Sequence, residues 1–360
     1  MSSASLRIGP LLTEPERKAW NDLAAGSPVG HRHQCLWWME PLQRYGFQSQ
    51  ALGCWMGNQL VGGALFRSYG VPFTGATISE CLDGPIFLRW ESAWADGWIR
   101  GLAQLSHAAG SMAVVIRDCP NEVVHRDLVA ALRRSAYDVE LTRGPADAVL
   151  ALKGRTPEQI LAGISHGTRA RIKKGQKRTP VRRLTRPDEL AQAYEAWISS
   201  ARRKGFTDLR PWPGLEPVLR HCIEQNQGSV LGSFMGDRLL GAAFITHVGS
   251  TASYVYGGYL DGAEKLNPTH VLQYEAIRDS LERGFEQYNF GYLLAEYQPD
   301  ARGVDEFKLG FGAEPRRHLD TITWKRRPVL YASVRALRSG RVGRLLESTL
   351  KRRLIKRGEA

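Results

Sequence analysis

The most constraining feature of the sequence is an internal repeat of a predicted β-hairpin. Residues 52–66 read LGCWMGNQLVGGALF and residues 231–245 read LGSFMGDRLLGAAFI, and seven of the fifteen positions are identical. In each copy an apolar run meets Gly-Asn or Gly-Asp, which supplies the positive φ angles of a tight turn, and a second apolar run follows. Such a repeat indicates that the chain holds two copies of one domain.

The segments after the two hairpins also correspond. The first copy continues with a strand-like GPIFL segment, a predicted helix at 92–109 and a predicted strand at 112–117. The second continues with a predicted strand at 252–259, a helix at 268–283 and a strand at 287–291.

This order resembles the GNAT (acyl-CoA N-acyltransferase) core, which is an α/β fold with a mixed central sheet. We therefore predict two tandem GNAT-like domains at 1–155 and 156–326, and a basic helical tail at 327–360.

Positive charge is concentrated in two stretches of the chain. The formal net charge is +13, residues 165–186 hold nine Lys or Arg and no acid, and residues 325–360 hold twelve against two Glu. Such stretches are either solvated faces or surfaces for polyanions, namely RNA, nucleotide phosphates or an anionic membrane face.

Other classes of protein find little support in the sequence. No apolar run is long enough to span a membrane, and the N-terminus lacks a signal-peptide pattern. The five cysteines are widely spaced, without a CxxC pair. We therefore expect free thiols, no metal site and a cytoplasmic protein.

Residues 163–167 match GxSxG, which is the nucleophile elbow of hydrolases when a strand precedes the serine and a helix follows it. Here the preceding TPEQILAGI looks helical, so we interpret Ser165 or Thr168 as the N-cap of a helix at about 166–178. That helix carries six cations in about three turns, and we expect it to lie against a polyanion or in solvent.

The predicted helix starts also bear on the acyl donor. Enzymes of the GNAT class that use acetyl-CoA hold its pyrophosphate with a Gly-rich turn, Arg/Gln-x-x-Gly-x-Gly/Ala, at a helix N-terminus. Neither 260–270 nor 89–94 has this pattern. The sequence therefore favours a different acyl donor and predicts no bound cofactor.

Five segments together resemble the Fem-type aminoacyltransferases (FemA, FemB and FemX) of peptidoglycan bridge formation. They are SHGTRARIKK at 165–174, YVYGG at 254–258, HVLQYEAI at 270–277, YNFG at 288–291 and GVDEFKLGFG at 303–312. The first half matches mainly through HQCLWW at 33–38 and the hairpin. The resemblance implies transfer of an amino acid from aminoacyl-tRNA to an amine of a peptidoglycan or other envelope precursor.

The resemblance also implies roles for residues of this chain. Phe307 and Lys308 match a Phe-Lys pair that contacts the acceptor end of the tRNA, and Lys308 can stabilise an oxyanion. Arg210 resembles a phosphate-binding Arg, while Leu42 occupies the place of a phosphate-binding Lys and Arg44 lies nearby. The candidates for proton acceptor are Asp305, Tyr254, Tyr256 and the substrate's own phosphate. Tyr254, Tyr256 and Gln273 are candidates for substrate binding. The candidates for binding tRNA or another polyanion are Arg169, Arg171, Lys173 and Lys174.

The tail has the spacing of amphipathic helices. Leu330, Val334 and Leu337, and then Leu346, Leu350 and Leu354, each form one helical face, with Gly340 and Gly343 between them. Such helices can lie peripherally on the anionic inner face of the cytoplasmic membrane, clamp tRNA or pack on the body.

Two other functions stay open. One is an acyl-CoA-dependent N-acyltransferase of envelope polysaccharide biosynthesis, and the other is a non-catalytic binding protein on the same fold.

Overall fold

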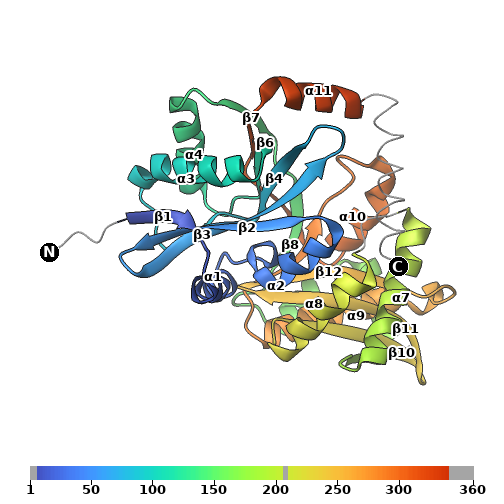
Figure 1. The fold of residues 1–360 in the computed structure, drawn as a ribbon. Coiled ribbons are helices and arrows are strands. Elements are labelled where there is room, and N and C mark those ends of the chain that lie inside the picture. The colour runs from blue at the N-terminus through green and yellow to red at the C-terminus, as the bar shows by residue number, and fades with distance from the viewer. Residues whose placement is uncertain (1–5, 206–209, 340–360) are drawn as a thin grey trace. The chain divides into compact units, whose positions relative to one another are not determined.

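The computed structural model describes residues 6–205 and 210–339, and these residues form two units (Figure 1). The first unit comprises residues 1–144 and 318–360, and the second comprises residues 145–317. This division differs from the domain boundaries predicted at 155 and 326. The reason is long-range strand pairing, because strand β8 (Ala146–Ala151) joins the sheet of the second unit and strand β15 (Thr321–Lys325) returns to that of the first.

The first unit is built on an eight-stranded mixed sheet. Its strand order is β1 (Leu6–Pro10), β2 (Gln48–Met56), β3 (Gln59–Val71), β4 (Ala76–Leu82), β6 (Ser111–Arg117), β15 and β7 (Asp138–Thr142), and β5 (Ile86–Phe87) pairs with β3. Its helices are α1 (Glu14–Gly26), α2 (Leu36–Met39), α3 (Ala95–Ala108), α4 (Glu122–Arg134) and α11 (Pro328–Ser339). The main core joins α3 and α4 to the sheet and includes the fully buried Trp98.

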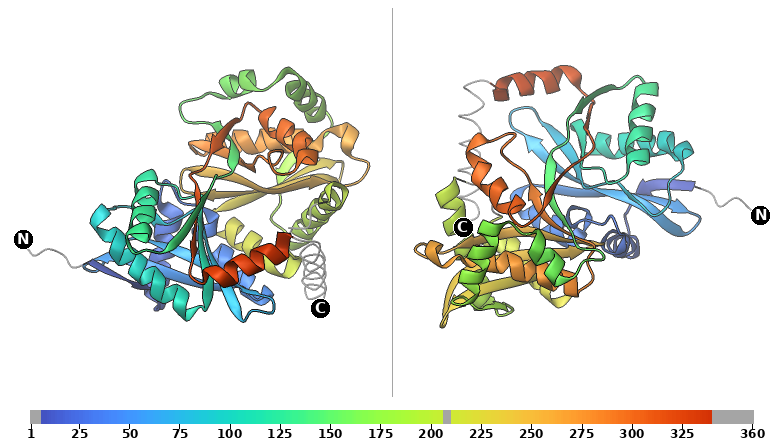
Figure 2. Two further views of the ribbon diagram at one scale, coloured as in Figure 1. Left: turned by 90° about the horizontal axis from the view of Figure 1, so that it is seen from above. Right: turned by 180° about the vertical axis from the view of Figure 1, so that it is seen from behind.

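The second unit has a seven-stranded mixed sheet. Its strand order is β14 (Glu314–Arg317), β8, β13 (Gln287–Tyr292), β12 (Thr251–Tyr259), β11 (Arg238–Val248), β10 (Gly228–Met235) and β9 (Val181–Arg183). Its helices are α5 (Pro157–Gly163), α6 (His166–Gln176), α7 (Pro187–Lys204), α8 (Trp212–Glu224), α9 (Pro268–Glu282) and α10 (Arg302–Leu309), and Figure 2 gives further views.

The two predicted hairpins are present and share their irregularities. Gly57 between β2 and β3, and Gly236 between β10 and β11, both have a φ of +58°. Each hairpin also has a bulge at the same place, since the register shifts between Cys54 and Trp55 in one and between Ser233 and Phe234 in the other. Matching turns and matching bulges support the interpretation that the two units are copies of one domain.

One predicted strand of the first unit is wrong. The GPIFL segment gives only the two-residue β5, which pairs back with β3. The counterpart of β12 is β4, which pairs antiparallel with β3 and parallel with β6. The sequence did not show β4 as a buried strand because it contains the polar residues Ser79 and Glu80. In the structure Ser79 hydrogen-bonds Ser68 and Ser111. Glu80 forms ion pairs with Arg67 and Arg117.

The GxSxG segment has the geometry expected of a helix cap. Helix α5 precedes Ser165, and the Ser165 hydroxyl accepts a hydrogen bond from the Thr168 amide at 3.4 Å. The strand that a nucleophile elbow needs is therefore replaced by a helix.

The described part of the tail packs on the body of the first unit. Leu330, Tyr331 and Val334 of α11 lie against a cluster that includes Val71 and Ala76. The second predicted tail helix, with Leu346, Leu350 and Leu354, lies outside the described residues. Among the described helices, none is long and apolar enough to cross a membrane.

Candidate active site of the second unit

The central parallel pair of the second unit separates at its carboxyl end. β12 and β13 pair only from Thr251 to Ser253 and from Gln287 to Asn289. A bulge at Val255 then turns β12 along β11, while the end of β13 pairs with β8 at Asp147. In the first unit, by contrast, β4 and β6 stay paired to Leu82 and Arg117. Ligands of open α/β sheets bind where neighbouring strands diverge, so the candidate site lies in the second unit.

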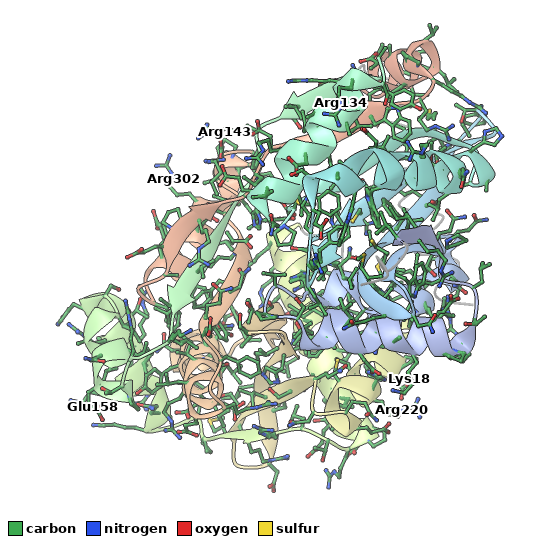
Figure 3. All side chains as sticks on the ribbon, turned by 90° about the vertical axis from the view of Figure 1, so that its left-hand side faces the viewer. Lys18, Arg134, Arg143, Glu158, Arg220 and Arg302 are labelled. Atoms are coloured by element: carbon green, nitrogen blue, oxygen red, sulfur yellow. The ribbon has the colours of Figure 1, made fainter. Side chains whose placement is uncertain are left out.

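Lys308 of α10 lies at this point. Its side chain is buried, and Nζ donates hydrogen bonds to the main-chain oxygens of Tyr292 at 2.5 Å and Gly291 at 3.4 Å. Burial lowers the pKa of Lys308 to about 8, although the Asp305 and Asp147 carboxylates oppose that shift. Arg302, at the start of the same helix, is exposed and points away from the unit (Figure 3). Lys308 therefore lies on the inward face of α10 and is not an ordinary surface lysine.

Phe307, which precedes Lys308 in α10, lies against a histidine that was not predicted as a site residue. The Phe307 ring contacts the rings of His270 at 5.1 Å and Phe311 at 5.2 Å. Burial and the charge of Arg171 lower the pKa of His270 to about 4, so the imidazole is neutral at pH 7. Its Nδ1 is buried and has no hydrogen-bond partner among the described residues, which is rare for a buried nitrogen. The signals in the sequence were its place at the head of the HVLQYEAI segment and its position two residues after Pro268, at a helix start.

Asp305 holds a loop rather than facing an open space. Its Oδ1 accepts a hydrogen bond from the Leu294 amide at 2.9 Å, and its Oδ2 accepts one from the Ala295 amide at 2.7 Å. Both carboxylate oxygens of this buried residue thus fix the segment that follows β13. The geometry favours a positioning role over the predicted role of proton acceptor.

The bulge at Val255 sends Tyr254 and Tyr256 to opposite faces of the sheet. Tyr254 reaches the core under α9, where it hydrogen-bonds Gln273, and burial raises its pKa. Gln273 is 1% exposed and also accepts a hydrogen bond from Tyr288 at 2.8 Å. Tyr256 instead packs on Trp197 at a ring distance of 5.8 Å. The structure therefore joins Tyr254 to Gln273 and separates both from Tyr256.

Residues 165–309, which cover most of this unit, match the acetyltransferase (GNAT) domain family. The second unit is therefore similar in sequence to GNAT-type acetyltransferase domains.

The whole chain shares its tandem fold with several solved structures. Against FemX the TM-score is 0.75 at 15% identity, with 88% of this chain and 97% of that chain covered. Against the C-terminal domain of a putative lysylphosphatidylglycerol synthetase from Agrobacterium fabrum the TM-score is 0.57 at 12% identity, covering 89% and 95%. A tandem GNAT protein of clavulanic acid biosynthesis gives 0.51 at 14% identity, covering 89% and 99%. These likenesses confirm the predicted tandem GNAT-like fold. No curated protein matches the sequence.

Helix α6 of the second unit has a cationic outer face. It buries Thr168, Ile172 and Gly175. Several basic side chains here are exposed and make no ion pair or hydrogen bond within the described part of the chain; they are Arg171, Lys173 and Lys174 in the helix, and Lys177 and Arg178 just after it.

Arg169, which the sequence placed with these cations, has a different role. Its Nη1 donates to the main-chain oxygens of Ala162 at 2.9 Å and Leu161 at 3.4 Å, so it caps the end of α5.

The start of α9 offers few groups for a pyrophosphate. Pro268 has no N–H, and the amides of His270 and Val271 already donate to the Asn267 oxygen at 3.1 and 3.4 Å. Helix α6 also packs on this region, because a Cβ at Gly175 would lie 2.4 Å from the Val271 side chain. The geometry agrees with the absence of a Gly-rich turn from the sequence.

The two candidate phosphate-binding arginines lie in different units. Arg210 is buried in the second unit, just before α8. Arg44 is exposed in the first unit, in the short 3-10 helix Glu40–Tyr45.

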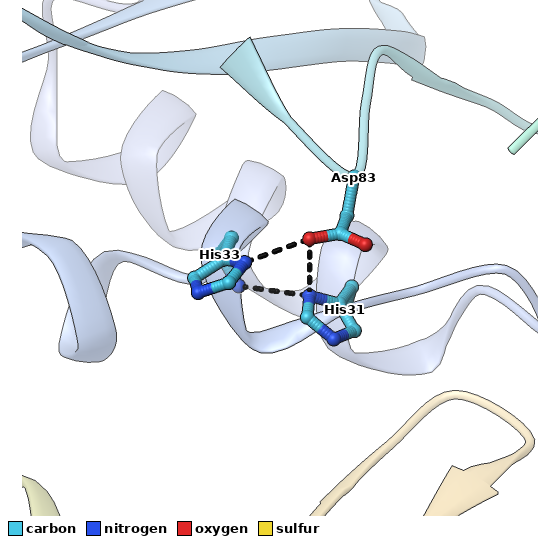
Figure 4. Close-up of side chains that lie close together, drawn as sticks. All are labelled: His31, His33 and Asp83. Carbon is cyan, nitrogen blue, oxygen red and sulfur yellow. Dashed lines mark hydrogen bonds and ion pairs between the residues drawn. The ribbon is translucent and has the colours of Figure 1, made fainter. Parts of the chain in front are cut away.

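His31, His33 and Asp83 of the first unit form a compact cluster, here named the Asp83 clamp (Figure 4). The Nδ1 atoms of His31 and His33 lie 2.8 and 2.7 Å from Asp83 Oδ2. Arg32 Nη1 lies 2.9 Å from His31 Nε2, and a guanidinium only donates, so a neutral His31 carries its proton on Nδ1 and donates it to Asp83. This bond to Asp83 is much shorter than the 3.4 Å between Nδ1 and the His33 amide, which also points at that atom. A metal ion would have to displace that proton beside the Arg32 charge. The residues therefore fit a hydrogen-bonded clamp better than a metal site.

Proposed function

We propose that this chain is an N-acyltransferase that transfers an amino acid from aminoacyl-tRNA to an amine of a peptidoglycan or other cell-envelope precursor. The observation that carries the proposal is the buried ammonium of Lys308 at the carboxyl end of β13, with Phe307 beside it. The fold shared with FemX and the cationic face of α6 support the same donor.

The reaction needs no covalent intermediate on the protein, because an aminoacyl ester is already activated. The amine nitrogen attacks the ester carbonyl, an oxyanion forms, and the C–O bond to the tRNA ribose breaks while that oxygen takes up a proton. An ammonium has three N–H donors, and Lys308 uses two on Tyr292 and Gly291. The third is free to donate to the oxyanion as it forms.

His270 is the candidate for accepting the proton of the attacking amine. It is neutral at pH 7 and lies against Phe307, whereas both oxygens of Asp305 are engaged and the partly buried Tyr254 has a raised pKa. A neutral imidazole can accept a proton where such a phenol cannot.

The donor is tested first by following hydrogen exchange of the full chain with bulk aminoacyl-tRNA and, separately, with acetyl-CoA. We expect aminoacyl-tRNA to protect 166–178 and 303–312, and acetyl-CoA to protect neither. Transfer of radiolabelled amino acids to envelope precursors then tests the reaction, with a nucleotide-linked precursor and phosphatidylglycerol as separate acceptors.

The main alternative is an acyl-CoA-dependent N-acyltransferase of envelope polysaccharide biosynthesis. It is favoured by the match to the acetyltransferase (GNAT) domain family and opposed by the start of α9. Protection of 256–275 by acetyl-CoA, with turnover of an acyl-CoA and none of any charged tRNA, would establish this alternative instead. A Lys308→Ala variant with unchanged function in cells would favour a non-catalytic binding protein.

A further inference from the structure

The tip of the β3–β4 hairpin in the first unit carries an aromatic side chain that the fold does not use. Phe73 is 92% exposed, and its backbone φ is +65°. That conformation suits glycine or asparagine and strains a bulky residue. Phe73 therefore contributes no packing while its backbone is strained and its ring is left in water. A partner that covers the ring accounts for both features.

The surroundings of Phe73 are uncharged and are braced by α11. Residues 68–79 contain no charged side chain. Below the tip, Val71 pairs with Ala76, and both pack against α11, which lies alongside the hairpin in each view (Figures 1 and 2). Helix α11 itself leaves Val329 81% and Leu337 58% exposed. We name Phe73, Val329 and Leu337 the tip surface.

The charge around the described part of α11 is mostly positive. Residues 321–337 contain four Lys or Arg and no Asp or Glu, although Lys325 pairs with Asp138 and Glu140. Among them, Arg327 is exposed at the start of α11, and the Arg335 side chain is 62% exposed although it pairs with Glu140. An apolar tip beside a stretch of cations suits a surface that is apolar below and anionic on top, which describes an anionic bilayer.

We propose that the tip surface docks on an anionic lipid bilayer, with Phe73 inserted at the level of the head groups. This contact differs from the one expected from the sequence, because Leu330 and Val334 are covered by the first unit. The proposal concerns the first unit and does not depend on the proposed function.

The test is co-sedimentation of the full chain with vesicles of phosphatidylglycerol and phosphatidylcholine, compared with vesicles of phosphatidylcholine alone. We expect binding to the anionic vesicles that weakens with salt. Phe73→Asn suits the positive φ and should leave the melting temperature unchanged or higher, yet it should weaken binding about tenfold or more. The matched control is Leu12→Asn, because Leu12 is also in the first unit and is 77% exposed.

A second measurement reports insertion directly. All five cysteines are buried, so a Phe73→Cys variant can be labelled selectively with an environment-sensitive dye. Anionic vesicles should shift its emission to the blue, while a labelled Leu12→Cys variant should not respond. Failure to bind anionic vesicles, or equal binding by Phe73→Asn and the unaltered chain, would overturn the proposal. Both assays omit acyl donor and acceptor, so their outcome is separate from that of the transfer assay.

Discussion

Lys308 and Tyr292 are joined by a hydrogen bond of 2.5 Å from the ammonium to the main-chain oxygen at the end of β13. This bond ties α10 to the point where β12 and β13 separate. It also holds a buried cation of lowered pKa at that point.

The first prediction concerns the charge of Lys308. If one ammonium N–H stabilises the oxyanion, Lys308→Met should lower kcat for transfer by about a hundredfold to a thousandfold. Because the pKa of Lys308 is about 8, its charge is present below that pH and is lost above it. The rate of the unaltered enzyme should therefore fall, relative to Lys308→Arg, as the pH rises through 8.

The matched measurement is the ratio of the two pH–rate profiles in single-turnover assays. A ratio that stays flat from pH 7 to 10 would remove Lys308 from the chemistry. Arg302→Met, a substitution at the exposed start of the same helix, should leave kcat unchanged.

Local signals and long-range pairing explain what the sequence could and could not predict here. The hairpins were predictable because Gly57-Asn58 and Gly236-Asp237 act within a few residues. The unit boundaries were not, since β8 and β15 take their places through pairing with distant strands.

The candidate site shows the same limit. The resemblance identified Phe307 and Lys308, and the strand at 287–291 was predicted, but no local pattern encodes the contact of Lys308 with the end of that strand. The bulge at Val255, which separates Tyr254 from Tyr256, contains no Gly or Pro itself, and Gly257 and Gly258 follow it without locating it.

The second prediction separates two roles for Asp305. Asp305→Asn keeps one oxygen acceptor but leaves the Leu294 or Ala295 amide without a partner, which should cost about 1–3 kcal/mol of the free energy of unfolding. At pH 7 and below, the transfer rate should fall by a similar factor at every pH, because the loop is disturbed. The basic limb should move to lower pH, because the Asp305 charge no longer raises the pKa of Lys308. Chemical denaturation and pH–rate profiles check this, and loss of the acidic limb of the profile would identify Asp305 as a general base instead.

The third prediction divides the basic residues of α6. Lys173→Ala with Lys174→Ala should weaken binding of tRNA and lower the slope of log K against log salt by roughly 1.5 to 2, as two phosphate contacts are lost. Arg169→Ala should instead destabilise the fold by about 1–3 kcal/mol and leave that slope unchanged, because Arg169 binds the carbonyls that end α5.

Filter binding over a range of salt concentrations measures the slope. Arg238→Ala, at an exposed hairpin turn of the same unit, is the control for a general loss of charge. An equal change of slope in the control and the double variant would argue against a specific contact with α6.

The fourth prediction concerns acid stability of the first unit. Burial and the Arg32 charge lower the pKa of His33 to about 3, below its ordinary value of 6.5. Between these two pH values the unfolded chain binds a proton that the folded chain does not, so stability falls as the pH drops from 6.5 to 3. Asp83, whose pKa is held well below its usual range by the histidines despite burial, adds to the loss at the lowest pH. His33→Asn retains a donor near Nδ1 but does not titrate, so its acid-unfolding midpoint should lie at lower pH than that of the unaltered chain.

Circular dichroism over pH 7 to 3 measures both midpoints. His107→Asn, on the last turn of α3, should leave the midpoint in place, and a shift as large as that of His33→Asn would show that the Asp83 clamp is not responsible.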